Sequence, residues 1–109
     1  MKTKGRKIKM PSIIHFGVRK INLVVCEMAD KYWGRWVSGT RTIEVTDRGI
    51  LSERGDTVCH ELVHAMLCLR GINLPPKVEE QVAIVIGDSF HEITVRNPEL
   101  IRWIEAGCP

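Results

Sequence analysis

The sequence lacks any run of apolar residues long enough to cross a membrane, and its four cysteines form no CxxC pair. A membrane helix needs about 20 consecutive apolar residues, and a secretory signal needs an apolar stretch of roughly 7–15 residues behind its basic start. The basic start is present, but no such stretch follows it. We therefore predict a cytoplasmic protein without membrane contact, whose cysteines are reduced thiols.

Internal repeats, low-complexity tracts and Gly/Ser linkers are also absent. The 109 residues suit one domain, and 44% apolar with 27% charged residues is an ordinary globular balance. A chain of this length buries roughly two thirds of its unfolded surface, which suffices for a core without disulfides. We predict a basic, flexible segment at residues 1–10 and a single domain over residues 11–109.

Acidic residues are missing from the first 20 positions, which hold seven of the 16 lysines and arginines. The other nine basic residues share the rest of the chain with all 13 acidic residues, so that part is net negative (9 − 13 = −4). Residues 2–9 are therefore the candidate contact for nucleic acid. Because no aromatic residues are interleaved with these charges, we favour a solvated tail over a nucleic-acid interface.

The first half of the chain predicts strands. Residues Ile13–Phe16 suit a short strand, and the apolar run Ile21–Met28 suits either a strand or the start of a buried helix. Arg41–Thr46 alternates apolar and polar residues, as a half-buried strand does. Asp47–Gly49 then predicts a turn.

The second half predicts helices. Asp56 suits the N-cap of a helix that runs to about Leu69, and Gly71 suits the position just beyond its end. A second helix is expected over Val78–Phe90 with an extension to Arg96, and a short last helix over Glu99–Glu105. Strands followed by helices indicate an α+β domain, in which a short, mostly N-terminal sheet packs on the first helix.

The first predicted helix carries the stretch TVCHELVHAM, which contains an HExxH motif. At about 100° per residue, His60 and His64 lie one turn apart on the same face, so their imidazoles can bind one ion. Two such histidines supply two of the three protein ligands of a catalytic zinc ion. Glu61 lies beside the pair, where it can reach a zinc-bound water as a general base.

Two adjacent acids open the next helix, and the short Gly71–Pro76 connection should fold that helix back beside the first. On a helical wheel Glu79 falls inside the apolar face, whereas Glu80 falls near its edge. That apolar face comprises Val78, Val82, Ala83, Ile86, Phe90 and Ile93. A carboxylate within a buried face is costly unless it is paired or binds a metal. We therefore expect Glu79 to be the third ligand, with Glu80 as the alternative.

Other residues near the motif have open roles. Cys68 lies one turn beyond His64 and is either a fourth ligand, which would close the site, or a small buried residue beneath the metal. Tyr32 or His91 could supply a second donor to a developing oxyanion, although packing roles are favoured for both. Trp33 and Trp36 more often pack onto the core than bind substrate.

The HELVH helix and the glutamates of the next helix resemble the zincin metallopeptidases, on the gluzincin side where the third ligand is glutamate. The stretch from Asp56 to Leu100, less than half of the chain, is most similar to small phage and mobile-element enzymes of the ImmA/IrrE-like and SprT-like groups. Further similarity lies in the spacing of Val82, Ala83, Ile86 and Phe90 and in the closing residues 96–100, RNPEL.

This resemblance implies a zinc endopeptidase in which His60, His64 and Glu79 hold Zn²⁺ and Glu61 is the base. It also implies a sheet of three or four strands with an edge strand that holds an extended substrate, for which Arg41–Thr46 is the candidate. The substrate would be a protein or peptide, for example a regulatory protein of a phage or mobile element. The alternatives are a non-catalytic metal-binding regulator and a DNA-associated module that uses the basic N-terminus.

Overall fold

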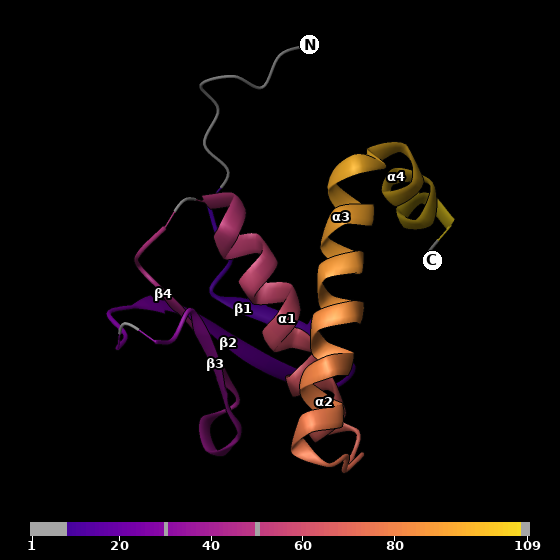
Figure 1. The fold of residues 1–109 in the computed structure, drawn as a ribbon. Coiled ribbons are helices and arrows are strands. Elements are labelled where there is room, and N and C mark those ends of the chain that lie inside the picture. Colours follow the sequence, from indigo (N-terminus) through magenta and orange to yellow (C-terminus); the bar gives the residue numbers. More distant parts are fainter. Residues whose placement is uncertain (1–8, 30, 50, 108–109) are drawn as a thin grey trace.

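The strands precede the helices in the computed structural model, which describes residues 9–29, 31–49 and 51–107 (Figure 1). The strands are β1 (Ile13–Phe16), β2 (Arg19–Cys26), β3 (Gly34–Val37) and β4 (Thr42–Thr46), with a 3-10 turn, η1 (Ser38–Thr40), before β4. The helices are α1 (Leu51–Leu69), α2 (Pro76–Val82), α3 (Asp88–Arg96) and α4 (Pro98–Gly107), with a π-helical turn, η2 (Ala83–Gly87), between α2 and α3. This order confirms the predicted α+β class.

The strands form one sheet in the order β1-β2-β4-β3. β1 and β2 make an antiparallel hairpin, β2 and β4 are parallel, and β3 is antiparallel to β4. The prediction that Arg41–Thr46 is an edge strand is therefore wrong, because β4 is hydrogen-bonded on both sides. The edge beside β4 is β3, a four-residue strand whose glycine and aromatic residues gave no alternating pattern in the sequence.

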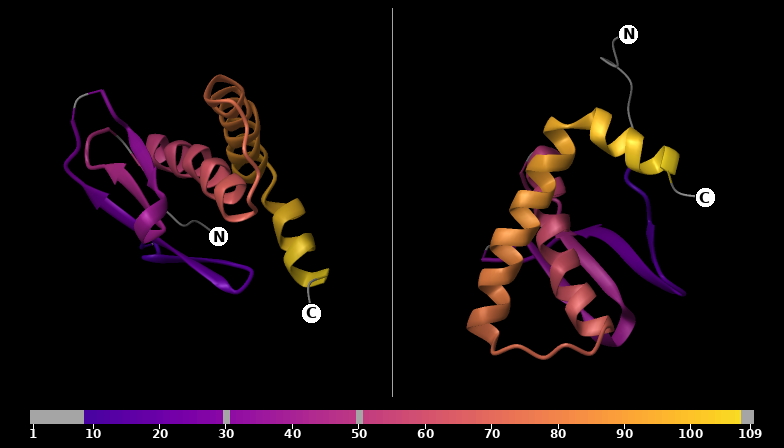
Figure 2. Two further views of the ribbon diagram at one scale, coloured as in Figure 1. Left: turned by 90° about the horizontal axis from the view of Figure 1, so that it is seen from below. Right: turned by 90° about the vertical axis from the view of Figure 1, so that its right-hand side faces the viewer.

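One face of the sheet packs on α1, and α1 lies between the sheet and the long helix formed by α2, η2 and α3 (Figure 2). The core contains Ile21 and Leu23 from β2, Ile43 and Val45 from β4, and Ala65 from α1. These strand residues alternate with exposed or half-buried neighbours, which is the pattern that a sheet covered on one face requires. The undecided stretch Ile21–Met28 is thus mostly strand.

Helix α1 begins at Leu51 rather than at Asp56, so Asp56 lies inside the helix and does not cap it. The end of α1 is as predicted. Gly71 has a φ of 71°, its N–H donates to Cys68 O (3.1 Å), and the N–H of Ile72 donates to Leu67 O (2.9 Å). These two bonds form a Schellman motif, which turns the chain sharply toward α2.

The long helix continues without a break from Pro76 to Arg96, so the predicted extension beyond Phe90 is confirmed. Its predicted buried face is largely wrong. Ala83 is fully buried, but Ile86, Phe90 and Ile93 are 53%, 56% and 47% exposed. The residues that approach α1 closely are small: Ala83 is fully buried, and a Cβ atom on Gly87 would lie 2.8 Å from Cα of His60.

Most of the basic segment predicted at residues 1–10, including most of residues 2–9, lies outside the described residues. Lys9 and Met10, which are described, are exposed. Within residues 9–29, 31–49 and 51–107, none of the helices combines the length and the apolar character that crossing a membrane requires.

Candidate metal centre

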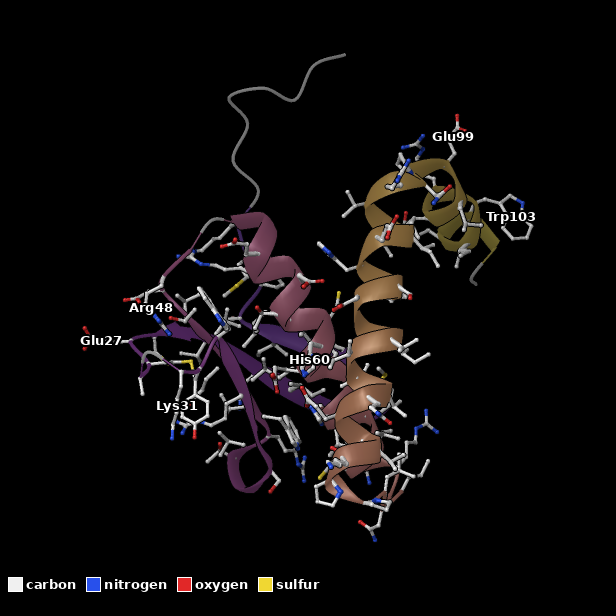
Figure 3. All side chains as sticks on the ribbon, in the orientation of Figure 1. Glu27, Lys31, Arg48, His60, Glu99 and Trp103 are labelled. Atoms are coloured by element: carbon white, nitrogen blue, oxygen red, sulfur yellow. The ribbon has the colours of Figure 1, made fainter. Side chains whose placement is uncertain are left out.

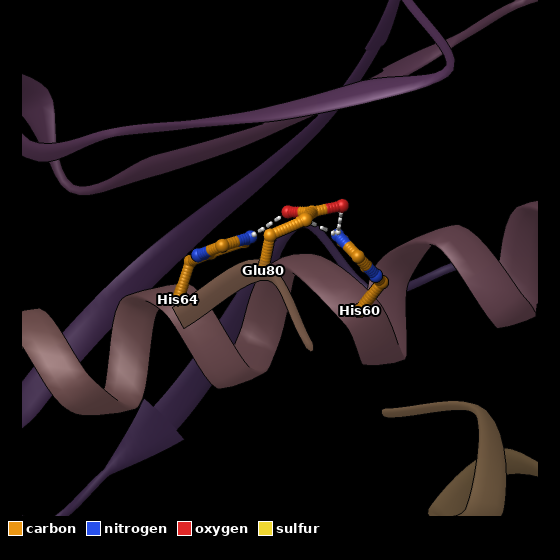
Figure 4. Close-up of side chains that lie close together, drawn as sticks. All are labelled: His60, His64 and Glu80. Carbon is orange, nitrogen blue, oxygen red and sulfur yellow. Dashed lines mark hydrogen bonds and ion pairs between the residues drawn. The ribbon is translucent and has the colours of Figure 1, made fainter. Parts of the chain in front are cut away.

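His60 and His64 project from one face of α1 toward the long helix, as the spacing of the HExxH motif predicts. Their ring centroids lie 5.1 Å apart with an angle of 65° between the planes. Both side chains are largely buried, with 19% and 18% exposure, so each imidazole is partly shielded from water. The two Nε2 atoms face the same point in space (Figure 4).

The carboxylate of Glu80, in the first turns of α2, lies at that point. Its Oε1 is 3.1 Å from Nε2 of His64, and its Oε2 is 3.2 Å from Nε2 of His60 (Figure 4). Two ligands of a tetrahedral zinc ion lie about 3.3 Å apart when each metal–ligand bond is about 2.0–2.1 Å. The ligand atoms of the three side chains all lie within 4.8 Å of one another, so this group could hold one small cation.

Glu79 lies close to the histidines as well, but on the other side of the His64 ring. Its Oε2 is 2.5 Å from Nδ1 of His64, and its side chain is 28% exposed. Successive helical residues point about 100° apart, so only one of the two glutamates can face the Nε2 atoms. In this structure Glu80, the alternative in the sequence analysis, lies at the Nε2 atoms, whereas Glu79, the expected ligand, contacts Nδ1 of His64.

The carboxylates change the acid–base behaviour of His64. Burial lowers the pKa of His64, but the hydrogen bond to Glu79 and the charges of Glu61 and Glu79 raise it, and the net direction is upward. The Glu79 carboxylate lies against Nδ1, so it can accept the Nδ1–H proton and leave Nε2 as the nitrogen that a metal ion would bind. Nε2 lies 3.1 Å from Glu80 Oε1, so in the metal-free protein a proton is shared between these two atoms, and a bound metal ion would take the place of that proton.

Glu61, the predicted base, is only 8% exposed. Burial raises the pKa of Glu61, and the nearby imidazoles of His64 and His60 counteract this only in part. The carboxylate accepts a hydrogen bond from the backbone N–H of Trp36 on β3. The side chain is therefore held between α1 and the edge strand, in an environment that favours its protonated form more than water does.

Glycines allow the neighbouring elements to approach this part of α1 closely. A Cβ atom on Gly87 would lie 2.8 Å from Cα and 3.0 Å from N of His60, so η2 contacts the backbone of α1 at the first histidine. On the opposite side of α1, a Cβ on Gly34 would lie 3.2 Å from Cγ of Glu61. These two close contacts hold the part of α1 that carries the histidine pair and Glu61. The HExxH motif gave no indication of either glycine contact.

His60 and Glu80 of the metal group line a cleft of about 700 Å³ between β3 and the long helix, and His64 adjoins them. Figure 3 shows His60 between α1 and that helix. The lining residues are Lys31, Tyr32, Trp33, Gly34, Glu53, Asp56, Thr57, His60, Glu61, Glu80, Ile84, Asp88 and His91. Both Tyr32 and His91 thus face the same space as His60.

The other residues weighed in the sequence analysis divide between the cleft and the surface. Trp33 lines the cleft at 52% exposure, whereas Trp36 packs against the core. Cys68 is exposed and is not part of the only group of His, Cys, Asp and Glu residues that is spaced for a metal within the described ranges. The arrangement therefore provides three ligand atoms and gives no support for Cys68 as a fourth.

We expect Gly87→Ala to destabilise the protein by about 1–3 kcal/mol, because the added methyl group overlaps the His60 backbone and forces the helices apart. Gly107→Ala is the matched control, since nothing lies within 4 Å of its added Cβ. Urea unfolding of both variants measures the difference. Equal stability of the two variants would show that the helices are not in contact at Gly87.

The raised pKa of Glu61 predicts a pH-dependent stability. Because the folded protein binds this proton more tightly than the unfolded chain does, Glu61 stabilises the fold below its unfolded pKa, and that contribution is lost as pH rises through its folded pKa. In metal-free protein, Glu61→Gln should therefore gain stability relative to wild type as pH increases over this window. Thermal unfolding between mildly acidic and neutral pH checks the sign, and a constant difference between the proteins would contradict it.

Comparison with known proteins assigns no family to this geometry. No family model matches the chain, and neither a curated protein nor a solved structure matches it. The functional inference therefore depends on the side chains themselves.

Proposed function

We propose that the protein is a zinc-dependent endopeptidase that hydrolyses peptide bonds with a metal-activated water. The observation that carries this proposal is the convergence of His60 Nε2, His64 Nε2 and the Glu80 carboxylate beside the buried Glu61. All four residues line or adjoin one open cleft. The resemblance of the HELVH helix to zincins agrees with this reading.

The donor set suits zinc. Two imidazole nitrogens and one glutamate oxygen are the protein ligands of many catalytic zinc sites, and they leave a position for water. Glu79 supplies the carboxylate partner that a metal-binding histidine ordinarily has behind it. A zinc ion bound by His60, His64 and Glu80 would lower the pKa of its water toward about 7 and polarise the substrate carbonyl.

Glu61 supplies the proton transfers in this proposal. Its carboxylate takes a proton from the attacking water as the water oxygen bonds to the carbonyl carbon, and then gives the proton to the amine nitrogen as the C–N bond breaks. Because the side chain is only 8% exposed, it stays in one place beside the ligand atoms for both proton transfers. The Trp36 N–H keeps the side chain oriented.

The edge strand β3 supplies a place for an extended substrate. The N–H of Thr46 donates to Trp33 O (2.9 Å), so these two residues form a hydrogen-bonded pair of the antiparallel strands. Along β3, residues whose backbone groups bond to β4 therefore alternate with residues whose backbone groups do not. Arg35 and Val37 therefore direct their backbone groups toward β4, whereas Gly34 and Trp36 direct theirs away from the sheet. A peptide chain along this edge would lie beside Glu61, in the mode by which strands add to a sheet edge. A regulatory protein of a phage or mobile element is the substrate class that the resemblance supports.

Metal content tests the ligand set. We expect about one zinc per chain, with affinity reduced at least about 100-fold in Glu80→Gln through loss of a ligand, and about tenfold in Glu79→Gln through loss of the contact behind His64. Glu92→Gln, which removes an exposed carboxylate from α3, is the control and should bind normally. Titration calorimetry and elemental analysis measure these values. A larger loss in Glu79→Gln than in Glu80→Gln would restore Glu79 as the ligand.

Cleavage tests the reaction. Zinc-loaded wild type should cut a proteome-derived peptide mixture, and Glu61→Gln should keep its zinc while losing activity by about 10²–10⁴-fold, since it removes the general base. Mass spectrometry of the products detects new termini. Full zinc occupancy without any cleavage by wild type would replace the peptidase with a non-catalytic metal-binding protein.

A further inference from the structure

The cleft extends beyond the metal group toward the N-terminal end of α1, and two walls of different chemistry face each other there. One wall consists of Tyr32 and Trp33, just before β3, with exposures of 40% and 52%. The other carries the carboxylates of Asp56 on α1 and Asp88 on α3. Asp56 precedes His60 by about one helical turn, so this region begins about 6 Å along the helix from the metal group.

The aromatic wall is held in place by Arg48. Its guanidinium lies 5.0 Å from the centroid of the Trp33 ring. It also donates hydrogen bonds to the carbonyl oxygens of Ala29 (3.0 Å) and Tyr32 (2.5 Å) and to Oγ1 of Thr46 (3.0 Å). Arg48 thus ties the backbone before β3 to Thr46 of β4, and the Trp33 ring lies against its guanidinium.

This surface already attracts a cation from the chain itself. The ammonium group of Lys31 lies 5.2 Å from the centroid of the Tyr32 ring, within the range of a cation–π interaction. Lys31 also lines the cleft and is the only lysine or arginine among its described lining residues. Aromatic faces beside an open cleft are the surfaces that bind ammonium and guanidinium groups in many proteins.

The opposite wall is negatively charged and only partly neutralised. Asp56 Oδ1 is 3.5 Å from Nδ1 of His91, which is a long contact, and the side chain of Asp88 makes no hydrogen bond or ion pair with the residues that the structure describes. A cation that entered between the walls would meet the two carboxylates and the Trp33 ring, and the Lys31 ammonium over Tyr32 is the one lysine or arginine group among the described lining residues.

We propose that this end of the cleft is a specificity subsite for a lysine or arginine side chain of the substrate, formed by Asp56, Asp88 and the aromatic wall. The inference rests on the proposed function, because it assigns the subsite to a peptide that lies along β3. An extended peptide on that edge places alternate side chains toward the cleft. A long basic side chain next to the scissile bond spans from the edge strand to the carboxylates, with its aliphatic part against Trp33.

Peptide binding tests this subsite without requiring turnover. The probes are fluorescein-labelled peptide mixtures that are randomised except for a central lysine, glutamine or glutamate, and fluorescence anisotropy measures their binding to zinc-loaded Glu61→Gln protein. We expect the lysine mixture to bind about tenfold more tightly than the glutamate mixture, with glutamine between them. Adding Asp56→Asn and Asp88→Asn should remove most of this difference, whereas Asp47→Asn, an exposed aspartate outside the cleft, should preserve it.

The outcomes separate this inference from the proposed function. Equal binding of the three mixtures, or a preference that survives in the Asp56→Asn/Asp88→Asn protein, would overturn the subsite. Cleavage by wild type without enrichment of lysine or arginine near the cut would also overturn it and leave the peptidase intact. Lysine-selective binding without any cleavage would support the subsite and refute the peptidase.

Discussion

The contact between Gly87 and the backbone of His60 is the constraint on which the candidate centre depends. Helices usually pack with their axes about 8–10 Å apart, and small residues at the contact bring them to the lower end of this range. Glu79 and Glu80 lie on the same continuous helix about two turns before Gly87. The two helices are close together at Gly87 and at the fully buried Ala83. This short separation determines whether the carboxylates of Glu79 and Glu80 can reach the imidazoles of α1.

Local features of the site and fold were predictable from the sequence because they depend on residues that are neighbours along the chain. The one-turn spacing of His60 and His64 places them together on any α-helix. Gly71 ends α1 in the left-handed conformation that a helix terminus favours. The alternation of Ile43 and Val45 marks a strand with one buried face, and both residues are fully buried in the core.

Features that depend on pairing between distant segments were not predictable in the same way. β3 is a strand because β4 hydrogen-bonds to it, and its own residues lack a periodic pattern. The choice between Glu79 and Glu80 depends on how α2 is rotated against α1. The π-helical turn at Ala83–Gly87 also shifts every later residue from the position that a regular wheel of about 100° per residue assigns, and the apolar residues beyond it are largely exposed.

Burial of Glu61 links the sheet, the helix and the proposed chemistry. Gly34 lets β3 approach α1 so closely that the carboxylate is covered on the strand side, and the Trp36 N–H is its hydrogen-bond donor there. Burying a carboxylate costs free energy that only partners recover, and the two imidazoles recover it in part. An apolar residue at position 61 would pack against β3 without this cost. A buried carboxylate beside three converging ligand atoms is therefore hard to explain by packing alone, and this is the placement that the proposed general base requires.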